Sequence, residues 1–214
     1  MGNIPLLSRE DEIFLAKQIE ITRKRFRRKM MESDYAINFA LDTLEKVNSN
    51  ELPFERTLRT SDTENTQKDQ ILGRMPVNLP TIRQLVAQNR EDWLIVADEN
   101  TPKKDRQVAK DRMVIRRRKL CTLLEELSVR THRLQPVFKK MELMATRMVQ
   151  LERDINALKH RVAAQREVAA MQRELAEYID QVQESPAEFK ARLDETRSRF
   201  DLWTDAKQQL SGGN

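Results

Sequence analysis

Residues 134–162 read LQPVFKKMELMATRMVQLERDINALKHRV, and their apolar positions decide the fold. These positions alternate in steps of three and four: Leu134, Val137, Met141, Met144, Met148, Leu151, Ile155, Leu158 and Val162. Such spacing lines up apolar side chains along one stripe of a helix, here over about four heptads. The stretch predicts one long amphipathic helix, with its three methionines in the core rather than on a binding surface.

A second apolar stripe follows, but its register is shifted by one residue. Its members are Val168, Met171, Leu175, Tyr178 and Val182. A slip near Gln165 argues against one uniform dimeric coiled coil, because a coiled coil needs an unbroken heptad repeat. An intramolecular antiparallel pair of helices fits better. We therefore expect an all-α fold, a multi-helix bundle with long antiparallel helices, and a monomeric chain.

Composition supports this fold class. Charged residues make up 34% of the 214 residues, aromatic residues 5%, and there are only 4 glycines. Residues such as Glu, Lys, Arg, Leu and Ala lose little side-chain entropy in a helix, and no period-two pattern of strand formers is present. No apolar run approaches the roughly 18 residues of a membrane span, and the first residues lack the basic start and apolar stretch of a secretion signal. We expect a cytoplasmic protein without a membrane partner.

Helix boundaries can be predicted at several places. Ser8 followed by Asp11 has the pattern of a capping box, and we expect the helix that it starts to bury Phe14, Ala16 and either Ile19 or Ile21. A helix containing Ile37, Leu41, Leu44 and Val47 should end near residues 48–50. Ser185 and Pro186 predict another start, for a helix that buries Phe189, Leu193, Phe200 and Trp203.

The region between residues 51 and 102 is harder to interpret. Pro53, Pro76 and Pro80 punctuate it, so we expect a short helix over residues 63–72 that Gly73 closes in the left-handed conformation. A separate helix over residues 82–96 should follow. Thr101 and Pro102 should stop that helix and begin the next, with threonine as the N-cap and proline in the first turn.

Catalytic chemistry has few candidates in this sequence. Cys121 and His132 are eleven positions apart, about 16 Å along a helix, which is too far for a shared metal ion. His160 lies further away, and a glycine-rich phosphate loop is absent from the sequence. We therefore expect a protein that is not an enzyme and that has no metal and no cofactor.

Positive charge is concentrated near the N-terminus. Residues 1–31 hold eight Lys and Arg against four Asp and Glu, whereas the remaining residues hold 31 against 30. Six of the eight cations lie within residues 23–29, and Arg23 and Arg27 are candidate phosphate contacts. Alternatively, these cations face water on a solvated helix, or acidic residues of the same chain lie beside them. Residues 116–119 form a similar run, with Glu125 and Glu126 nearby.

The first twenty residues, MGNIPLLSREDEIFLAKQIE, resemble a known family. They are similar to region 1.2 of primary, housekeeping-type sigma factors of bacterial RNA polymerase. That family has a methionine-glycine pair, a short apolar stretch ending in two leucines, and then Ser/Thr-Arg-Glu-x-Glu before Leu/Ile-Ala-Lys-x-Ile-Glu. Almost every position of this sequence matches the pattern.

The end of the sequence agrees with this resemblance. Residues 206–210, AKQQL, followed by Asn214, look like the approach to sigma region 2, although Gly212 and Gly213 depart from the larger residues common there. The resemblance implies three parts: residues 1–31 as a region 1.2-like segment, residues 32–209 as a helical insertion, and residues 210–214 as the start of a link to region 2. We expect both ends of this chain to be boundaries within a longer protein.

The resemblance also implies a function in transcription initiation. In the family, region 1.2 lies beside the non-template strand just downstream of the −10 element and senses this discriminator DNA, while the insertion faces the β′ subunit of RNA polymerase core. Family contacts upstream of the methionine-glycine pair are missing here, as are regions 2–4, so this chain alone should not direct transcription. The resemblance and the basic run together nominate these nucleic-acid-binding candidates: Met1, Gly2, Asn3, Ile4, Leu6, Leu7, Arg23 and Arg27.

Two other functions remain possible from the sequence. A helical adaptor could bind another protein through the apolar stripe of residues 134–182, and an open stripe would then cause self-association. A nonspecific nucleic-acid binder could use residues 23–29, and its affinity would fall steeply with salt.

Overall fold

The computed structural model describes residues 6–64 and 66–212, and in this part of the chain every regular element is a helix. The order is α1 (Arg9–Met30), α2 (Asp34–Asn48), α3 (Phe54–Thr57), α4 (Lys68–Ala97), α5 (Lys103–Glu125), α6 (Thr131–Leu158), a 3-10 turn η1 (Val162–Ala164), α7 (Gln165–Val182) and α8 (Pro186–Gly212). The predicted all-α fold with long helices is confirmed. No described helix is long and apolar enough to cross a membrane.

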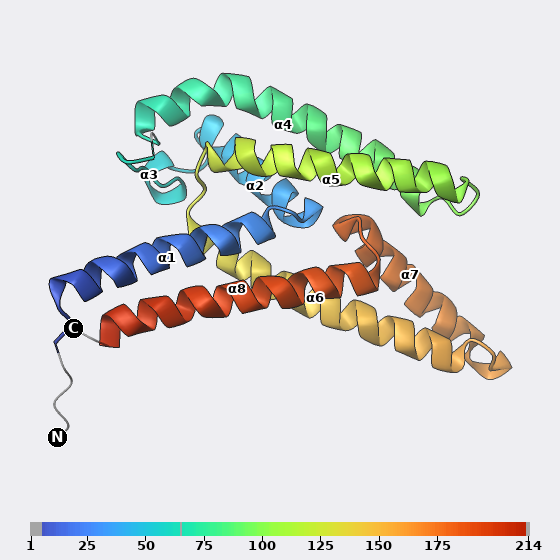
Figure 1. Cartoon of the computed structure of the whole chain (residues 1–214). Helices are drawn as coiled ribbons and strands as arrows, with labels where there is room; N and C mark the ends of the chain where they lie inside the picture. Colours follow the sequence, from blue (N-terminus) through green and yellow to red (C-terminus); the bar gives the residue numbers. More distant parts are fainter. Residues whose placement is uncertain (1–5, 65, 213–214) are drawn as a thin grey trace.

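Three antiparallel pairs of helices form the molecule (Figure 1). Helices α4 and α5 lie together on one side, α6 and α7 form a second pair, and α1 packs along α8. Helix α2 lies between the α4–α5 pair and α6. Because α8 runs back along α1, Figure 1 shows the end of α8 beside the start of α1.

The core is one continuous cluster that draws on α1, α2, α4, α5, α6 and α8. At its centre the rings of Phe26, Phe138, Phe200 and Trp203 join α1, α6 and α8, with neighbouring ring centroids 5.3–5.9 Å apart. Edge-to-face and stacked pairs at such distances add to the stabilisation from buried area. The predicted boundary between a region 1.2-like segment and an insertion at residue 31 stays a prediction. Residues on both sides of this boundary contribute to the same core.

The apolar stripe of residues 134–162 is confirmed over most of its length. Its first six positions, from Leu134 to Leu151, are buried. The chain turns after α6, so Val162 is 89% exposed and its predicted place in the helix was wrong. Helix α7 begins at Gln165, where the register slips, and returns antiparallel to α6 (Figure 1).

The prediction for residues 63–102 was wrong in its main feature. A single helix, α4, runs through Gly73, Pro76 and Pro80, where we expected a helix end and a separate helix. A proline removes one backbone hydrogen bond to the carbonyl four residues earlier. Here Leu72, Pro76 and Pro80 are all exposed, so water can solvate the freed carbonyls. Figure 1 shows that α4 is arched along its length.

The start of α5 also differs by one residue from the expectation. Pro102 takes the N-cap position and Lys103 is the first helical residue. The Thr101 hydroxyl does not cap this helix, because it donates a hydrogen bond to the Asp98 carboxylate at 2.9 Å. The turn between α4 and α5 is therefore closed by a contact within the turn.

Candidate nucleic-acid interface

The start of α1 is fixed by a reciprocal cap, as predicted. The Ser8 hydroxyl oxygen accepts a hydrogen bond from the Asp11 backbone N–H at 3.1 Å, and the same hydroxyl donates to the Asp11 carboxylate at 2.8 Å. The Ser8 backbone N–H also donates to that carboxylate, at 3.4 Å. The cap therefore sets the direction in which the preceding residues leave the helix.

The candidate residues before the cap lie at the surface where the structure describes them. Leu6 is 87% exposed and Leu7 is half-buried. Met1, Gly2, Asn3 and Ile4 lie outside the described residues. Leu6 is thus an apolar side chain that the fold does not use for its own core.

Helix α1 has two faces, and the expected burial of Phe14 was wrong. Its buried face consists of Leu15, Thr22, Phe26 and Met30, with Ile19 packed partly against the core. Phe14 is 60% exposed, and Ala16, Ile13 and Ile21 are also exposed. Because Phe14 and Ile21 are two turns apart, they lie on one outward stripe, and the exposed cation Lys17 lies between them.

The guanidinium of Arg27, a candidate phosphate contact, is turned into the protein. Arg27 is only 2% exposed, and two of its nitrogens donate to the two carboxylate oxygens of Glu125 at 2.9 and 3.0 Å. A third nitrogen donates to the Thr131 hydroxyl at 3.0 Å. Arg27 therefore ties α1 to the α5–α6 junction and does not present its charge to a ligand in this structure.

Arg23, the other candidate in the basic run, is also committed to partners within the chain. Its side chain donates to the Glu20 carboxylate at 2.9 and 3.3 Å and is largely covered. Arg59 approaches the same carboxylate. Burial raises the pKa of Glu20, but the hydrogen bond and charge of Arg23, with those of Arg59, outweigh burial, so the pKa of this carboxyl lies below its ordinary value.

Four further cations of the run divide into two kinds. Lys24 pairs with Glu64, and Lys29 pairs with both Glu32 and Glu195. The side chains of Arg25 and Arg28 are exposed and have no ion pair or hydrogen bond to any described residue. The interpretation in which acids of the same chain lie alongside therefore holds for most of the run, but not for these two arginines.

The free cations line a groove of about 880 Å³ between α1 and the α4–α5 pair. Seven basic and four acidic side chains surround it, which leaves an excess of positive charge. Arg118 on α5 contributes another exposed guanidinium without a described side-chain partner. The sequence showed the basic run that contains Arg118 but not its place beside the first run, because the two lie about ninety positions apart and only the fold brings them together.

Two other members of the second basic run have partners other than the expected Glu125 and Glu126. Arg116 pairs with Asp92 on α4, and Arg117 is buried against Asp34 on α2. Cys121, one turn later, also borders the groove. Burial raises the pKa of its thiol to about 11, and the nearby Glu125 adds to this effect, so the thiol is neutral at physiological pH.

Comparison with known families gives a match at the same end of the chain. Residues 1–24 match the family described as Sigma-70 factor, region 1.2. Among curated proteins, none matches the sequence. The family match covers the residues before the Ser8 cap and α1 as far as Lys24, so it includes Leu6, the outward stripe and the first two cations of the run. The N-terminal 24 residues are therefore similar to region 1.2 of the sigma-70 factors.

Proposed function

We propose that this chain is the part of a primary, sigma-70-type initiation factor that lies around region 1.2. In this role it helps RNA polymerase engage promoter DNA at the discriminator, and it contributes contacts to the polymerase core. The observation that carries the proposal is the match of residues 1–24 to region 1.2. The matched segment is also the part of α1 and its approach where apolar side chains face outward.

Leu6 and the outward stripe support two different contacts. Leu6 lies just before a capped helix start and is free to pack on a base or sugar of an unpaired strand. Phe14 and Ile21 lie further along α1, beside Lys17 and Lys24. Exposed apolar residues with flanking polar ones are typical of protein interfaces, so this stripe suits the polymerase core.

The arrangement of α1 and α8 is compatible with an insertion between two sigma regions. Helix α8 ends beside the start of α1 (Figure 1), so a chain that left region 1.2 would return close to its starting point after passing through α2–α7. We propose that residues 32–209 form this insertion and that it faces the β′ subunit. The proposed role is non-enzymatic and cytoplasmic, with the chain as a monomer.

The experiment replaces Leu6 with Ser in a sigma factor that carries this chain. We expect shorter-lived open complexes and a weaker preference among promoters that differ only in the discriminator, with core binding little changed. Removal of one apolar side chain from such an interface should cost about 1–2 kcal/mol of binding free energy. This cost corresponds to a roughly five- to thirtyfold shorter lifetime of the open complex. The measurement is the dissociation rate of open complexes across a discriminator series.

The matched control is Val162→Ser, which removes an equally exposed apolar side chain at the turn between α6 and α7. This control should leave the lifetimes unchanged. Equal lifetimes for Leu6→Ser and the parent on every discriminator would contradict the proposed contact.

A second candidate function uses the basic groove. Arg25, Arg28 and Arg118 are free to meet phosphates, so nonspecific binding of nucleic acid is favoured by a specific feature of the surface. The adaptor alternative has less support, because the apolar stripe that it requires is buried within the chain at Leu134, Met141 and Met148. The groove and the region 1.2 segment adjoin on α1, so both could contact the same DNA.

A further inference from the structure

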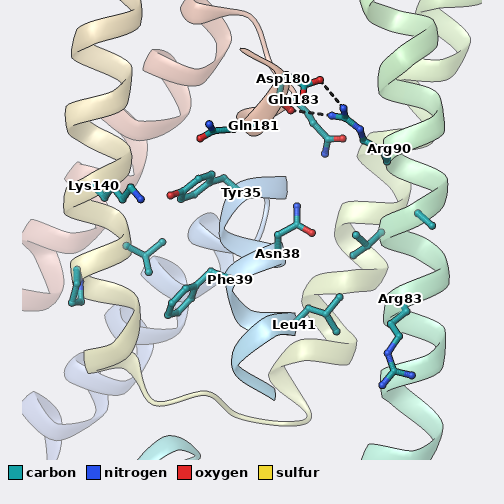
Figure 2. Close-up of a pocket in the computed structure, with 14 residues that line it drawn as sticks. Tyr35, Asn38, Phe39, Leu41, Arg83, Arg90, Lys140, Asp180, Gln181 and Gln183 are labelled. Atoms are coloured by element: carbon teal, nitrogen blue, oxygen red, sulfur yellow. Dashed lines mark hydrogen bonds and ion pairs between the residues drawn. The ribbon is translucent and has the colours of Figure 1, made fainter. Parts of the chain in front are cut away.

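A second cavity, of about 900 Å³, lies between α2, α4, α6 and α7 and has no part in the proposed function (Figure 2). Its apolar lining includes Tyr35 and Phe39 from α2, Val86 from α4, and Pro136 and Val137 from α6. This volume is within the range of sites for small organic ligands, which combine apolar walls with a few placed polar groups. The aromatic rings of Tyr35 and Phe39 could pack against a flat, apolar ring of a ligand.

Gln183 supplies an unusual polar group at this cavity. It follows α7 with a positive φ of 54°, is only 5% exposed, and lines the cavity. Its backbone is fixed, since its N–H donates to the Ile179 carbonyl at 2.8 Å and its carbonyl accepts from Arg117 at 3.3 Å. A non-glycine residue in the left-handed region is uncommon and needs surroundings that hold it there.

The side-chain oxygen of Gln183 is buried without a hydrogen-bond donor among the described residues. Buried acceptors in native proteins nearly always receive a hydrogen bond, because a buried acceptor without one costs free energy. Figure 2 shows the Gln183 amide reaching into the space beside α4. A ligand with an N–H or O–H group in this cavity could donate the missing bond.

The charges around the cavity favour an anion. Arg90 pairs with Asp180 at 2.7 Å, and Arg83 pairs with Glu45, so both arginines are neutralised. Lys140 on α6 has no ion pair or hydrogen bond to any described residue. Figure 2 shows the Tyr35 hydroxyl turned toward the Lys140 side of the cavity. One free ammonium and one hydroxyl thus lie on the side facing α6, where a carboxylate could bind.

We propose that this cavity binds a small aromatic carboxylate that carries an N–H or O–H donor. The ring system lies on Tyr35 and Phe39, the donor satisfies the Gln183 oxygen, and the carboxylate meets Lys140. The site joins the α4–α5 pair to the α6–α7 pair, so an occupied cavity would hold these two pairs together. This proposal does not depend on a function in transcription.

The test is a titration of the ¹⁵N-labelled full chain with indole-3-acetate, indole-3-propionate and indole-3-butyrate, followed by amide chemical shifts. These probes share the flat body and the N–H donor and differ in the reach of the carboxylate. At least one should give saturable shifts confined to amides around the cavity. Its N-methyl analogue should bind about tenfold more weakly, because it cannot donate to the Gln183 oxygen.

Lys140→Gln tests the carboxylate contact, with the neighbouring Lys139→Gln as the matched control outside the cavity lining. Lys140→Gln should weaken the best probe about three- to fivefold, the range for a partly exposed ion pair, and Lys139→Gln should leave it unchanged. Absence of saturable shifts for all three probes would overturn the proposal. Equal binding of the N-methyl analogue and the parent probe, or equal effects of the two lysine variants, would also overturn it.

Discussion

Arg27 and Arg117 carry charges that sequence analysis placed in basic runs and that the fold buries. The carboxylate partner of Arg117 is 83 positions away at Asp34, and that of Arg27 is 98 positions away at Glu125. A local pattern cannot show a partner at that distance. The run of six cations was therefore correctly found in the sequence, but which of them are free could be decided only by the packing of α1 against α5 and α6.

The buried pair of Arg117 and Asp34 gives a stability prediction. Arg117 Nε donates to Asp34 Oδ2 at 2.6 Å, and both side chains are almost fully covered. Asp34→Asn leaves the arginine charge buried without a counter-charge, which should lower the free energy of unfolding by about 3–5 kcal/mol. The measurement is urea unfolding followed by circular dichroism.

The control for this prediction is Asp42→Asn, on the same helix. Asp42 pairs with Lys46 at 2.9 Å, but both side chains are exposed. Removal of such an exposed pair should leave the unfolding free energy almost unchanged, because water and salt screen the attraction. Similar decreases for the two variants would mean that the Arg117–Asp34 pair does not hold the interior as described.

Cys121 predicts a pH dependence. Burial raises the pKa of its thiol from 9.0 to about 11, so the unfolded chain ionises this group first. The contribution of the neutral, buried thiol to folding stability is therefore fully present below pH 9 and is lost as the pH rises toward 11. At pH 8, iodoacetamide should alkylate the folded chain about a hundredfold more slowly than the urea-unfolded chain. Equal alkylation rates would contradict this burial.

At the scale of single elements, the sequence correctly predicted the helix starts that contacts between neighbouring residues control. The capping box at Ser8 and the start of α8 were correct, since Ser8 pairs with Asp11 and the Ser185 hydroxyl accepts from the Glu188 N–H at 3.2 Å. Each contact spans three residues and is visible as a motif. The effect of Pro76 within α4 was predicted wrongly because it depends on whether the carbonyl that the proline frees faces water, and tertiary packing decides that.

The predicted burial of Phe14 failed for a related reason. Both stripes of α1, one through Leu15 and Phe26 and the other through Phe14 and Ile21, contain apolar residues at helical spacing. Periodicity alone cannot say which stripe meets the core. The structure assigns the core to the stripe of Leu15 and Phe26, and the outward stripe of Phe14 and Ile21 is exposed.

The groove beside α1 predicts salt-dependent binding of single-stranded DNA. We expect the double variant Arg28→Gln/Arg118→Gln to weaken binding and to reduce the slope of log K against log salt by about 0.7 for each phosphate that is no longer neutralised. The measurement is fluorescence anisotropy of a labelled oligonucleotide between low and moderate salt. Arg153→Gln, at an exposed position of α6 away from the groove, is the control and should leave affinity and slope unchanged. An unchanged slope in the double variant would exclude these arginines as phosphate contacts.

At the scale of the whole molecule, the sequence predicted the all-α fold class and the α6–α7 pair. It did not predict how the helix pairs pack against one another. The slip near Gln165 correctly placed the turn, because a break in the heptad pattern is a local signal. The pairing of α1 with α8 joins residues more than 150 positions apart through Phe26 and Trp203. Each helix has an apolar stripe that several partners could cover, so complementarity of side chains in the folded core selects the pair. The free cation Arg118 and the cavity at Gln183 likewise exist only once distant helices meet.

We propose that this chain contacts RNA polymerase through α1, and binding of the purified chain to RNA polymerase core tests this contact most directly. Phe14→Asp should weaken binding at least about tenfold, because it places a charge in an apolar contact. Val162→Asp, which changes an exposed apolar residue outside α1, should leave binding unchanged. Saturable binding that Phe14→Asp alone disrupts is the result that we predict. No binding to core, or binding that both variants leave intact, would contradict the account.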